Sequence, residues 1–273
     1  MGNLFLRNAI APKNIMKNQI VLGVDIGGTG IKGGLIDIET GTMVSERHRI
    51  PTPQPPTVEA VAETFKALVK HFSWDGSIGV GFPAIIRNGT AYSASNIDKK
   101  WIGTNVQDVL SVASRCPVYV VNDADAAGIA SKKFGVGKNE EGVVILLTIG
   151  TGIGSAIFSE GHLVPNTELG SLFMPNQTEI VEKQLSNKVR KENEISWEEW
   201  GALFNKYLIH LERLYSPSLF IIGGGGSKRF DKYKDQIHVN CVVKSAQLLN
   251  QAGAIGAAYY AWQKTNQALD ISN

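Results

Sequence analysis

The chain has 273 residues, of which 43% are hydrophobic and 19% are charged, and its formal net charge is +2. This length and composition suit a globular protein of one large or two smaller domains. A near-neutral balance argues against a nucleic-acid partner, which favours a basic face, and no apolar run reaches the length of about 18 residues that a membrane helix needs. We therefore expect a cytoplasmic protein with no nucleic-acid or membrane partner.

The cysteine content is low. Cys116 and Cys241 offer neither a disulfide framework nor a cluster of zinc ligands. We expect both to be buried, reduced thiols, and we expect no structural zinc.

The first 18 residues precede the first patterned segment. They lack the long apolar core and the small-residue cleavage site of a secretory signal, and Leu6 stands where a myristoylation signal needs Ser or Thr. Residues 1–18 are therefore expected to form a flexible N-terminal arm.

The first patterned segment is a pair of strand-like runs on either side of a glycine-rich turn. It reads VLGVDIGG, TG and IKGGLID between Ile20 and Asp37, and the same design returns as VVILLTIG, TG and IGSAIF between Val143 and Phe158. This internal repeat predicts two similar α/β domains, each presenting a glycine turn.

Helical and strand-like patterns alternate along the rest of the chain. Apolar residues at helical spacing predict a helix from Thr57 to Phe72, with Thr57 as its N-cap, then a strand in SIGVGF, a polar loop, and a strand in PVYVVND. In the second half we expect an amphipathic helix from Ser196 to Leu214, a strand and glycine loop in SPSLFIIGGGGSK, and a small-residue helix from Ala252. This alternation is typical of α/β architecture.

The glycine turns favour phosphate binding. Gly28, Gly30 and Gly33 match the dinucleotide fingerprint G-x-G-x-x-G, but the residues after them predict a strand and not the helix that this fingerprint requires. A glycine-rich hairpin turn can still bind phosphate, because its bare backbone lets N–H groups approach the oxygens closely. The alternative is a tight β-turn that needs glycine for positive φ alone. Two matching turns and a third glycine loop at residues 223–226 favour the phosphate site.

Four segments in combination resemble the ROK family of repressors and sugar kinases: DIGGTGIKGG, NDADAAG, LTIGTGIGSA and LFIIGGGGSK. Within that family TPQPPT, SNIDKKWIGT, VPNTELG and SPSLFIIGGGGSK resemble the polyphosphate glucokinases, and the resemblance runs from about Ile20 to Trp262. It implies an actin-like, hexokinase-like α/β fold of two ribonuclease-H-like domains with a central cleft, and a homodimer. The expected domains are residues 19–121 together with 253–273, and residues 122–252.

Asn122 and Asp123 follow directly after the strand-like segment from Val118 to Val121. The carboxyl end of a strand is where α/β folds place chemistry, and phosphoryl transfer needs a group that takes the proton of the attacking hydroxyl. The resemblance implies that Asp123 is this base and that Asn122 binds the sugar, as does Asn96. The alternative role of Asp123 or Asp125 is the N-cap of the following helix, and Asp125 suits that role.

The family's sugar-binding stretch reads E-L-G-H-L-E, and here the corresponding segment reads ELGSLF, from Glu168 to Phe173. By resemblance Glu168 accepts sugar hydroxyl protons. Ser171 and Phe173 replace the family's histidine and second glutamate, and Ser171 is also predicted to bind the sugar. Leaving a buried sugar hydroxyl without its partner costs about 1–3 kcal/mol.

The expected function is transfer of a phosphoryl group from polyphosphate, ATP or both to the 6-hydroxyl of glucose or a related hexose. The replacements at Ser171 and Phe173 leave open a catalytically weakened or non-catalytic sugar-binding relative. A kinase for N-acetyl sugars or for acetate is a further alternative, because the fold does not fix the substrate.

The phosphate donor is expected at the three glycine segments. Asp25 is predicted to hold Mg²⁺ through water, since magnesium sites use few carboxylates. The predicted phosphate- or nucleotide-binding residues are Asp25, Gly27, Gly28, Thr29, Gly30, Lys32, Thr148, Gly150, Thr151, Gly152, Gly223, Gly224 and Gly225. A long polyphosphate also needs a cationic groove. Its candidates, each of which is singly better explained as a solvated surface residue, are Lys32, Lys99, Lys100, Lys228 and Arg229.

Overall fold

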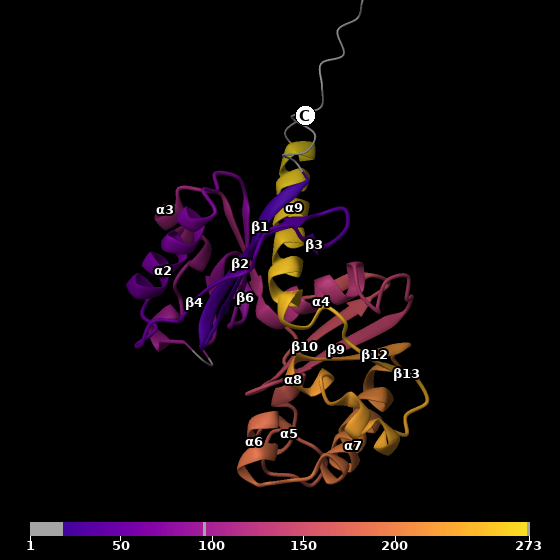
Figure 1. The fold of residues 1–273 in the computed structure, drawn as a ribbon. Helices are drawn as coiled ribbons and strands as arrows, with labels where there is room; N and C mark the ends of the chain where they lie inside the picture. The colour runs from indigo at the N-terminus through magenta and orange to yellow at the C-terminus, as the bar shows by residue number, and fades with distance from the viewer. Residues whose placement is uncertain (1–18, 95–96, 272–273) are drawn as a thin grey trace, which may run out of the picture.

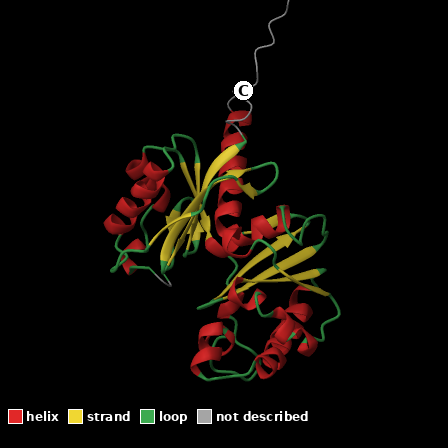
Figure 2. Cartoon of the chain, in the orientation of Figure 1, coloured by secondary structure: helices red, strands yellow, loops and turns green. Residues whose placement is uncertain are grey.

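The computed structural model describes residues 19–94 and 97–271, so the N-terminal arm expected at residues 1–18 and the predicted sugar ligand Asn96 lie outside the described residues. Two lobes, each built on one β-sheet, meet at a pair of helices (Figure 1). Helices flank both sheets (Figure 2). The chain has the mixed α/β architecture that the sequence predicts.

The first lobe contains a six-stranded sheet with the order β3-β2-β1-β5-β8, and β4 pairs with β2 beside β3. Its strands are β1 (Ile20–Gly27), β2 (Gly30–Asp37), β3 (Thr42–Met43), β4 (His48–Ile50), β5 (Ile78–Phe82) and β8 (Val118–Asn122). The short strands β6 (Ile86–Arg87) and β7 (Thr90–Ala91) form a separate hairpin. The helices of this part of the chain are α2 (Val58–His71), α3 (Val106–Ser114) and the 3₁₀ helix η1 (Lys99–Trp101).

The second lobe contains a five-stranded sheet with the order β11-β10-β9-β12-β13. Its strands are β9 (Val143–Ile149), β10 (Ile153–Ser159), β11 (His162–Val164), β12 (Leu219–Gly223) and β13 (Val242–Ser245). The helices around it are α5 (Glu182–Leu185), α6 (Asn187–Glu192), α7 (Trp197–Tyr215), α8 (Gly224–Ser227) and the 3₁₀ helices η2 (Leu169–Ser171), η3 (Phe230–Lys232), η4 (Lys234–Gln236) and η5 (Leu249–Gln251).

The two sheets share one topology. In each, an antiparallel hairpin comes first, and two further strands then run parallel to the first strand of the hairpin: β5 and β8 beside β1, and β12 and β13 beside β9. The predicted internal repeat is thus confirmed in the strand pairing. The carboxyl ends of the parallel strands lie at one edge of each sheet, which is the position where α/β folds place their ligands.

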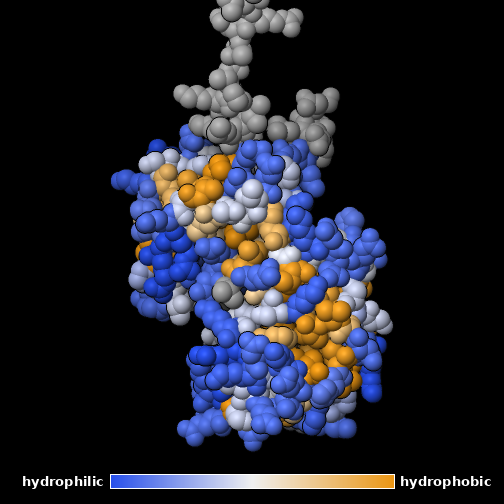
Figure 3. All heavy atoms as spheres, turned by 45° about the vertical axis from the view of Figure 1, so that its right-hand side comes forward, coloured by the Kyte–Doolittle hydropathy of each residue, from blue (hydrophilic) through white to orange (hydrophobic). Residues whose placement is uncertain are grey.

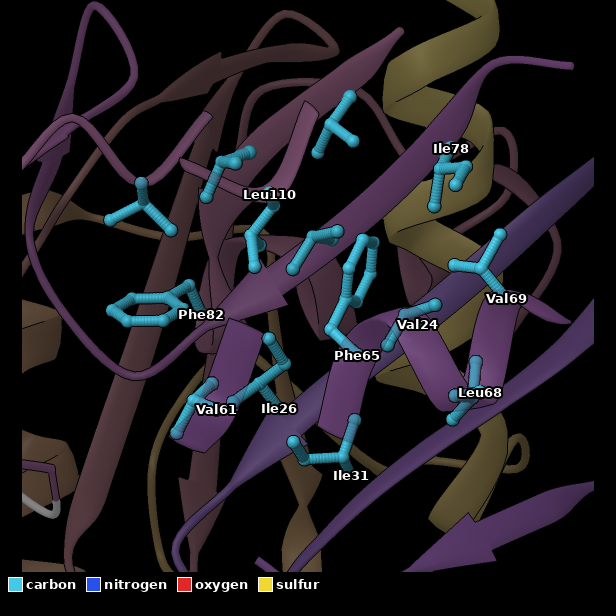
Figure 4. Packing of buried hydrophobic residues seen from close by; sticks show 14 of the residues in the cluster. Val24, Ile26, Ile31, Val61, Phe65, Leu68, Val69, Ile78, Phe82 and Leu110 are labelled. Atoms are coloured by element: carbon cyan, nitrogen blue, oxygen red, sulfur yellow. The ribbon is translucent and has the colours of Figure 1, made fainter. Parts of the chain in front are cut away.

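A compact apolar core lies between the first sheet and α2. Val61, Phe65 and Leu68 recur on one face of α2, and they pack against buried residues of β1 and β5 such as Val24 and Ile78 (Figure 4). Burying one side chain of this kind stabilises the fold by about 1.5–3 kcal/mol. Thr57 caps the helix by accepting a hydrogen bond from the Ala60 N–H, as predicted.

Two helices join the lobes. Helix α4 (Asp123–Lys133) follows β8, and the C-terminal helix α9 (Ala252–Ile271) returns to pack on β1, β5 and α4. Close approach requires glycine here, because a Cβ atom on Gly79 would overlap the carbonyl oxygen of Ala257, and one on Gly256 would overlap that of Ala126. The domain limits at 121/122 and 252/253 stay a prediction.

One predicted loop is a helix. The polar segment between SIGVGF and PVYVVND contains α3, which begins after the N-cap Asn105 and buries Val106 and Leu110. Its nine residues are too few to give a clear apolar period, so the sequence suggested a loop. Helix α7 begins after Ser196, which forms a capping box with Glu199, in agreement with the sequence.

Hydrophilic residues cover most of the face in Figure 3, and hydrophobic residues gather where the lobes meet and on one side of the lower lobe. Within residues 19–94 and 97–271, no helix is long and apolar enough to cross a bilayer. Cys116 is buried as predicted, whereas Cys241 is only half-buried; both are free thiols.

Candidate active site

Asp123 lies where the first lobe passes into α4. Asn122 ends β8 and caps α4, because its side-chain oxygen accepts hydrogen bonds from the N–H groups of Ala124 (2.9 Å) and Asp125 (3.0 Å). The Asn122 amide also donates to the carbonyl of Ala84 at 3.0 Å. The suggestion that Asp125 is the N-cap is therefore wrong, and Asp123 does not cap the helix either.

Burial raises the pKa of Asp123 to about 7, and the charges of Asp25 and Glu168 add to this increase. The Ala124 N–H, which donates to the Asp123 carboxylate at 2.8 Å, opposes it. A pKa near neutral pH suits a general base, because the carboxylate can be ionised to accept a proton and can still hold that proton once accepted.

A cavity of ≈ 280 Å³ brings most of the second-lobe candidates to Asp123. Pro83, Ala84 and Ser93 form its wall on the first lobe, and the second glycine turn forms the opposite wall. The predicted site residues that line it are Asn122, Asp123, Thr148, Gly150, Thr151, Gly152, Glu168 and Gly224.

The first glycine turn is not part of this lining. Asp25 lies close enough for its charge to raise the pKa of Asp123, and it pairs with Lys32 at 3.2 Å. Arg49 and Thr52 hold the turn itself by donating to the carbonyls of Thr29 (2.6 Å) and Gly27 (2.5 Å). The predicted residues outside the lining are Asp25, Gly27, Gly28, Thr29, Gly30, Lys32, Ser171, Gly223 and Gly225.

Positive φ does not explain the glycines of the two hairpin turns. Among the described residues, no glycine of either hairpin turn has a positive φ. Of the glycines that do, only Gly224 lies in a predicted phosphate-binding segment. The close neighbours of a Cβ atom on Gly30 or Gly152 would be the ends of the Arg49 and Glu182 side chains, which are flexible and can move away. The interpretation of these turns as ones that need glycine for φ alone is thus wrong.

Glu182 is a site residue that was not predicted from the sequence. This residue begins α5 and lines the cavity, and its carboxylate accepts a hydrogen bond from the Ile153 N–H at 2.8 Å, beside the second glycine turn. Desolvation raises the pKa of Glu168, and the charge of Glu182 adds to the increase, so the two carboxylates face one cavity. No spacing rule links Glu182 to the turn that it contacts.

The segment before Glu168 is attached to the first lobe. The Asn166 side chain donates to the Ile86 carbonyl (2.8 Å) and accepts from the Ile86 N–H (2.7 Å), while the Asn166 N–H donates to Asp125 (2.8 Å). Asp125 is 1% exposed, and its other carboxylate oxygen is buried without a hydrogen-bond partner in the described part of the chain.

The two replaced positions of the sugar stretch lie elsewhere. Ser171 and Phe173 are exposed, Phe173 by 58%, and neither lines the cavity. The polar side chain that the cavity offers from this stretch is Glu168.

The carboxylates near the cavity are the candidate ligands for the predicted Mg²⁺. Among the described residues, no group of three or more His, Cys, Asp or Glu side chains lies close enough to hold a metal. Mg²⁺ commonly uses only one or two carboxylates and completes its shell with water and substrate phosphates. Asp25, whose charge is close enough to raise the pKa of Asp123, fits that donor set, and its carboxylate forms an ion pair with Lys32.

Comparison with known proteins agrees with this geometry. A model of the ROK family matches residues 21–170, more than half of the chain. The chain is 42% identical over 237 residues to the "Polyphosphate glucokinase" of Mycobacterium tuberculosis (strain CDC 1551 / Oshkosh), covering 86% of this chain and 89% of the relative.

Solved structures give the same result. The inorganic polyphosphate/ATP-glucomannokinase of Arthrobacter sp. strain KM superposes with a TM-score of 0.85 at 42% identity, covering 90% of this chain and 99% of the other. A ROK family glucokinase from Streptomyces griseus, in complex with glucose and AMPPNP, superposes with a TM-score of 0.77 at 25% identity, covering 89% and 99%.

Proposed function

Because the chain belongs to the ROK family, we propose that it is a sugar kinase which transfers a phosphoryl group from polyphosphate or ATP to the 6-hydroxyl of glucose or a related hexose. The actin-like fold is that of its structural relatives. The observation that carries the proposal is the single cavity that joins Asp123, Glu168 and the second glycine turn.

In this proposal Asp123 accepts the proton of the 6-hydroxyl as that oxygen attacks the terminal phosphorus of the donor. The bond between this phosphorus and the bridging oxygen breaks, and polyphosphate shortened by one unit, or ADP, leaves. Glu168 accepts hydrogen bonds from other sugar hydroxyls and thereby orients the sugar, which supports catalysis by positioning. The exposed backbone and hydroxyl of the turn at Gly150, Thr151 and Gly152 bind donor phosphate. The side-chain oxygen of Asn122 is already used by α4, so its free amide N–H is the group left for the sugar.

Mg²⁺ is part of the proposal, held by Asp25 through water. When bound, the ion neutralises charge on the donor phosphates. We also propose that the protein is a cytoplasmic homodimer. Analytical ultracentrifugation would measure its mass in solution and test the dimer.

The alternative of a non-catalytic sugar-binding protein is not favoured, since the relatives at 42% identity are named as kinases. The altered positions Ser171 and Phe173, which suggested that alternative, do not line the cavity.

The test combines turnover with a matched pair of variants. Protein, Mg²⁺ and glucose or mannose are mixed with polyphosphate or ATP, and sugar phosphate is detected by ³¹P NMR. Asp123→Asn should fold normally and lower kcat by about 10²–10⁴-fold, the usual contribution of a general base. Asp108→Asn, in the first turn of α3 and away from the cavity, is the control and should leave kcat unchanged. Near-normal turnover of Asp123→Asn would remove Asp123 from the mechanism, and no sugar phosphate with any hexose would refute the kinase proposal.

A further inference from the structure

A second cavity of ≈ 360 Å³ lies on the far side of the third glycine loop, and we name it the basic pocket. Its charged lining residues are all cations: Arg190, Lys191, Lys228, Arg229 and Lys232. Among residues 19–94 and 97–271, no Asp or Glu lines it. We propose that the basic pocket binds the part of a polyphosphate chain that extends beyond the reacting phosphates, an inference that rests on the proposed kinase function.

The basic pocket adjoins the catalytic cavity. Gly224 lines the cavity of Asp123, and the next residue, Gly225, lines the basic pocket. A second segment makes the same connection, because Glu182 lines the first cavity and Asn187, at the start of α6, lines the second. A chain held at the second glycine turn therefore has a short route along Gly224 and Gly225 into the basic pocket.

The cations of the pocket are available for an anion. Lys191, Lys228, Arg229 and Lys232 are exposed, and none of them forms an ion pair with a described residue. Two carboxylates of the neighbouring segments pair with lysines outside the pocket: Glu192 with Lys188 and Asp231 with Lys234. Concentrated charge of one sign attracts an ion of the opposite sign and raises its local concentration.

Arg190 is held in place before any ligand binds. Its guanidinium donates to Asn187 (3.2 Å) and to the Ile195 carbonyl (2.8 Å), and it lies 4.1 Å from the centre of the Trp197 ring. A fixed guanidinium loses little rotational freedom on binding phosphate.

The same contacts make the basic pocket a poor site for a nucleoside base. A base needs a free aromatic or apolar face, but the Trp197 ring contacts Arg190 and stacks on Tyr233 at 5.6 Å. The lining therefore favours a repeating anion, and polyphosphate carries one along its whole length. Of the cations predicted for a polyphosphate groove, Lys228 and Arg229 line this pocket, whereas Lys32, Lys99 and Lys100 do not.

Steady-state kinetics with donors of graded length test the proposal. The double variant Lys228→Gln/Lys232→Gln should raise KM for long-chain polyphosphate about tenfold, and change KM for tripolyphosphate and for ATP less than about twofold, with kcat retained. It should also reduce the salt dependence of KM for the long chain, because fewer charges are neutralised. The control Lys138→Gln/Lys206→Gln removes two exposed lysines of the second lobe that do not line the pocket and form no ion pair with the part of the chain that the structure describes. It should change no KM.

Three results would overturn the proposal: an unchanged KM for the long chain, an equal rise for all donors, or the same rise in the control. Equal effects on ATP and polyphosphate would assign the pocket to phosphates that both donors share. If the wild type shows no turnover, the kinase proposal fails by itself, and calorimetric titration with long-chain polyphosphate then tests the pocket. Weaker binding by the double variant than by the control would support the proposal, and equal binding would refute it.

Discussion

The Asn166 side chain forms hydrogen bonds with both the N–H and the carbonyl of Ile86, the first residue of β6. A side chain of the second lobe thus pairs with the edge of β6 that faces away from β7, as a neighbouring strand would. Its own N–H is held by Asp125, which belongs to the helix between the lobes. The segment that leads into Glu168 is therefore tied at one residue to the first lobe and to α4. The position of a sugar ligand thus depends on a contact between lobes.

Asn166→Ala should lower both stability and sugar affinity. The substitution leaves two backbone groups of Ile86 without partners and should lower the free energy of unfolding by about 1–3 kcal/mol. Because Glu168 loses its anchored neighbour, KM for glucose should rise about tenfold with a smaller change in kcat. Urea denaturation and steady-state kinetics measure the two effects.

Asn176→Ala is the matched control for that substitution. Both asparagines have positive φ, 59° for Asn166 and 63° for Asn176, but Asn176 is exposed and forms no side-chain hydrogen bond with a described residue. It therefore reports the cost of the left-handed backbone alone. Equal loss of stability in both variants would show that the contact with Ile86 contributes nothing.

The rate should depend on the ionisation of Asp123. A base with a pKa of about 7 accepts a proton only when ionised, so kcat/KM should rise as the pH increases through about 7 and then level off. Asp25→Asn removes a charge that raises this pKa. Because Asp25 is also the proposed Mg²⁺ ligand, the variant should have a lower kcat, and the pH-dependent rise of its remaining activity should move to lower pH. A pH profile of kcat/KM that stays flat across this region in the wild type would contradict the assignment.

Asp125→Asn should stabilise the protein at alkaline pH. Burial raises the pKa of Asp125 to about 7, so between its ordinary value and about 7 the folded protein holds a proton that the unfolded chain releases. Stability contributed at this site therefore decreases as the pH rises through that window. The asparagine avoids the buried charge and keeps an acceptor for the Asn166 N–H, and the gain at pH about 8 should be about 1–3 kcal/mol.

The gain should shrink when the same urea denaturation is repeated at pH about 5. Asp108→Asn, an exposed acid in the first turn of another helix, is the control and should show no such dependence. A gain that does not change with pH would mean that packing, and not ionisation, explains the effect.

Gly79→Ala should destabilise the protein strongly, because its methyl group would overlap the backbone of α9 at Ala257. Overpacking against backbone costs about 3 kcal/mol or more, since a helix axis has to move. Gly81 lies two residues further along β5, and a Cβ atom there has its nearest neighbour at 3.5 Å, an ordinary contact. Thermal unfolding should therefore show a large decrease in Tm for Gly79→Ala and a small one for Gly81→Ala; equal decreases would contradict the packing argument.

Local pattern was sufficient for much of the fold. The hairpins at β1–β2 and β9–β10, the caps at Thr57 and Ser196 and the small-residue helix α9 all have signals within a few residues of sequence. Helix α3 was missed because it is short and its apolar residues are few. The glycine and alanine content of α9 indicates that it packs closely on its neighbours. The sequence does not indicate which residues of α9 lie against which residues of β1 and β5.

The site was less predictable, because its walls come from distant segments. Asp123 and the second glycine turn could be located by motif, yet Glu182 enters through α5, and Asn166 acts through the backbone of a residue 80 positions away. The first glycine turn resembles the second in sequence but does not share its cavity. Sequence similarity between two turns therefore did not establish that both face one space.

The packing of α9 sets an order of events during synthesis. The first sheet has its strands complete by Asn122, but the helix that covers one face of β1 and β5 begins only at Ala252. A nascent chain must leave the ribosome almost entirely before that face is covered, so the amino-terminal half cannot mature as it emerges. Fragments that end before Ala252 should accordingly be poor starting points for expression, and a circular permutant that places α9 ahead of β1 should be a good one.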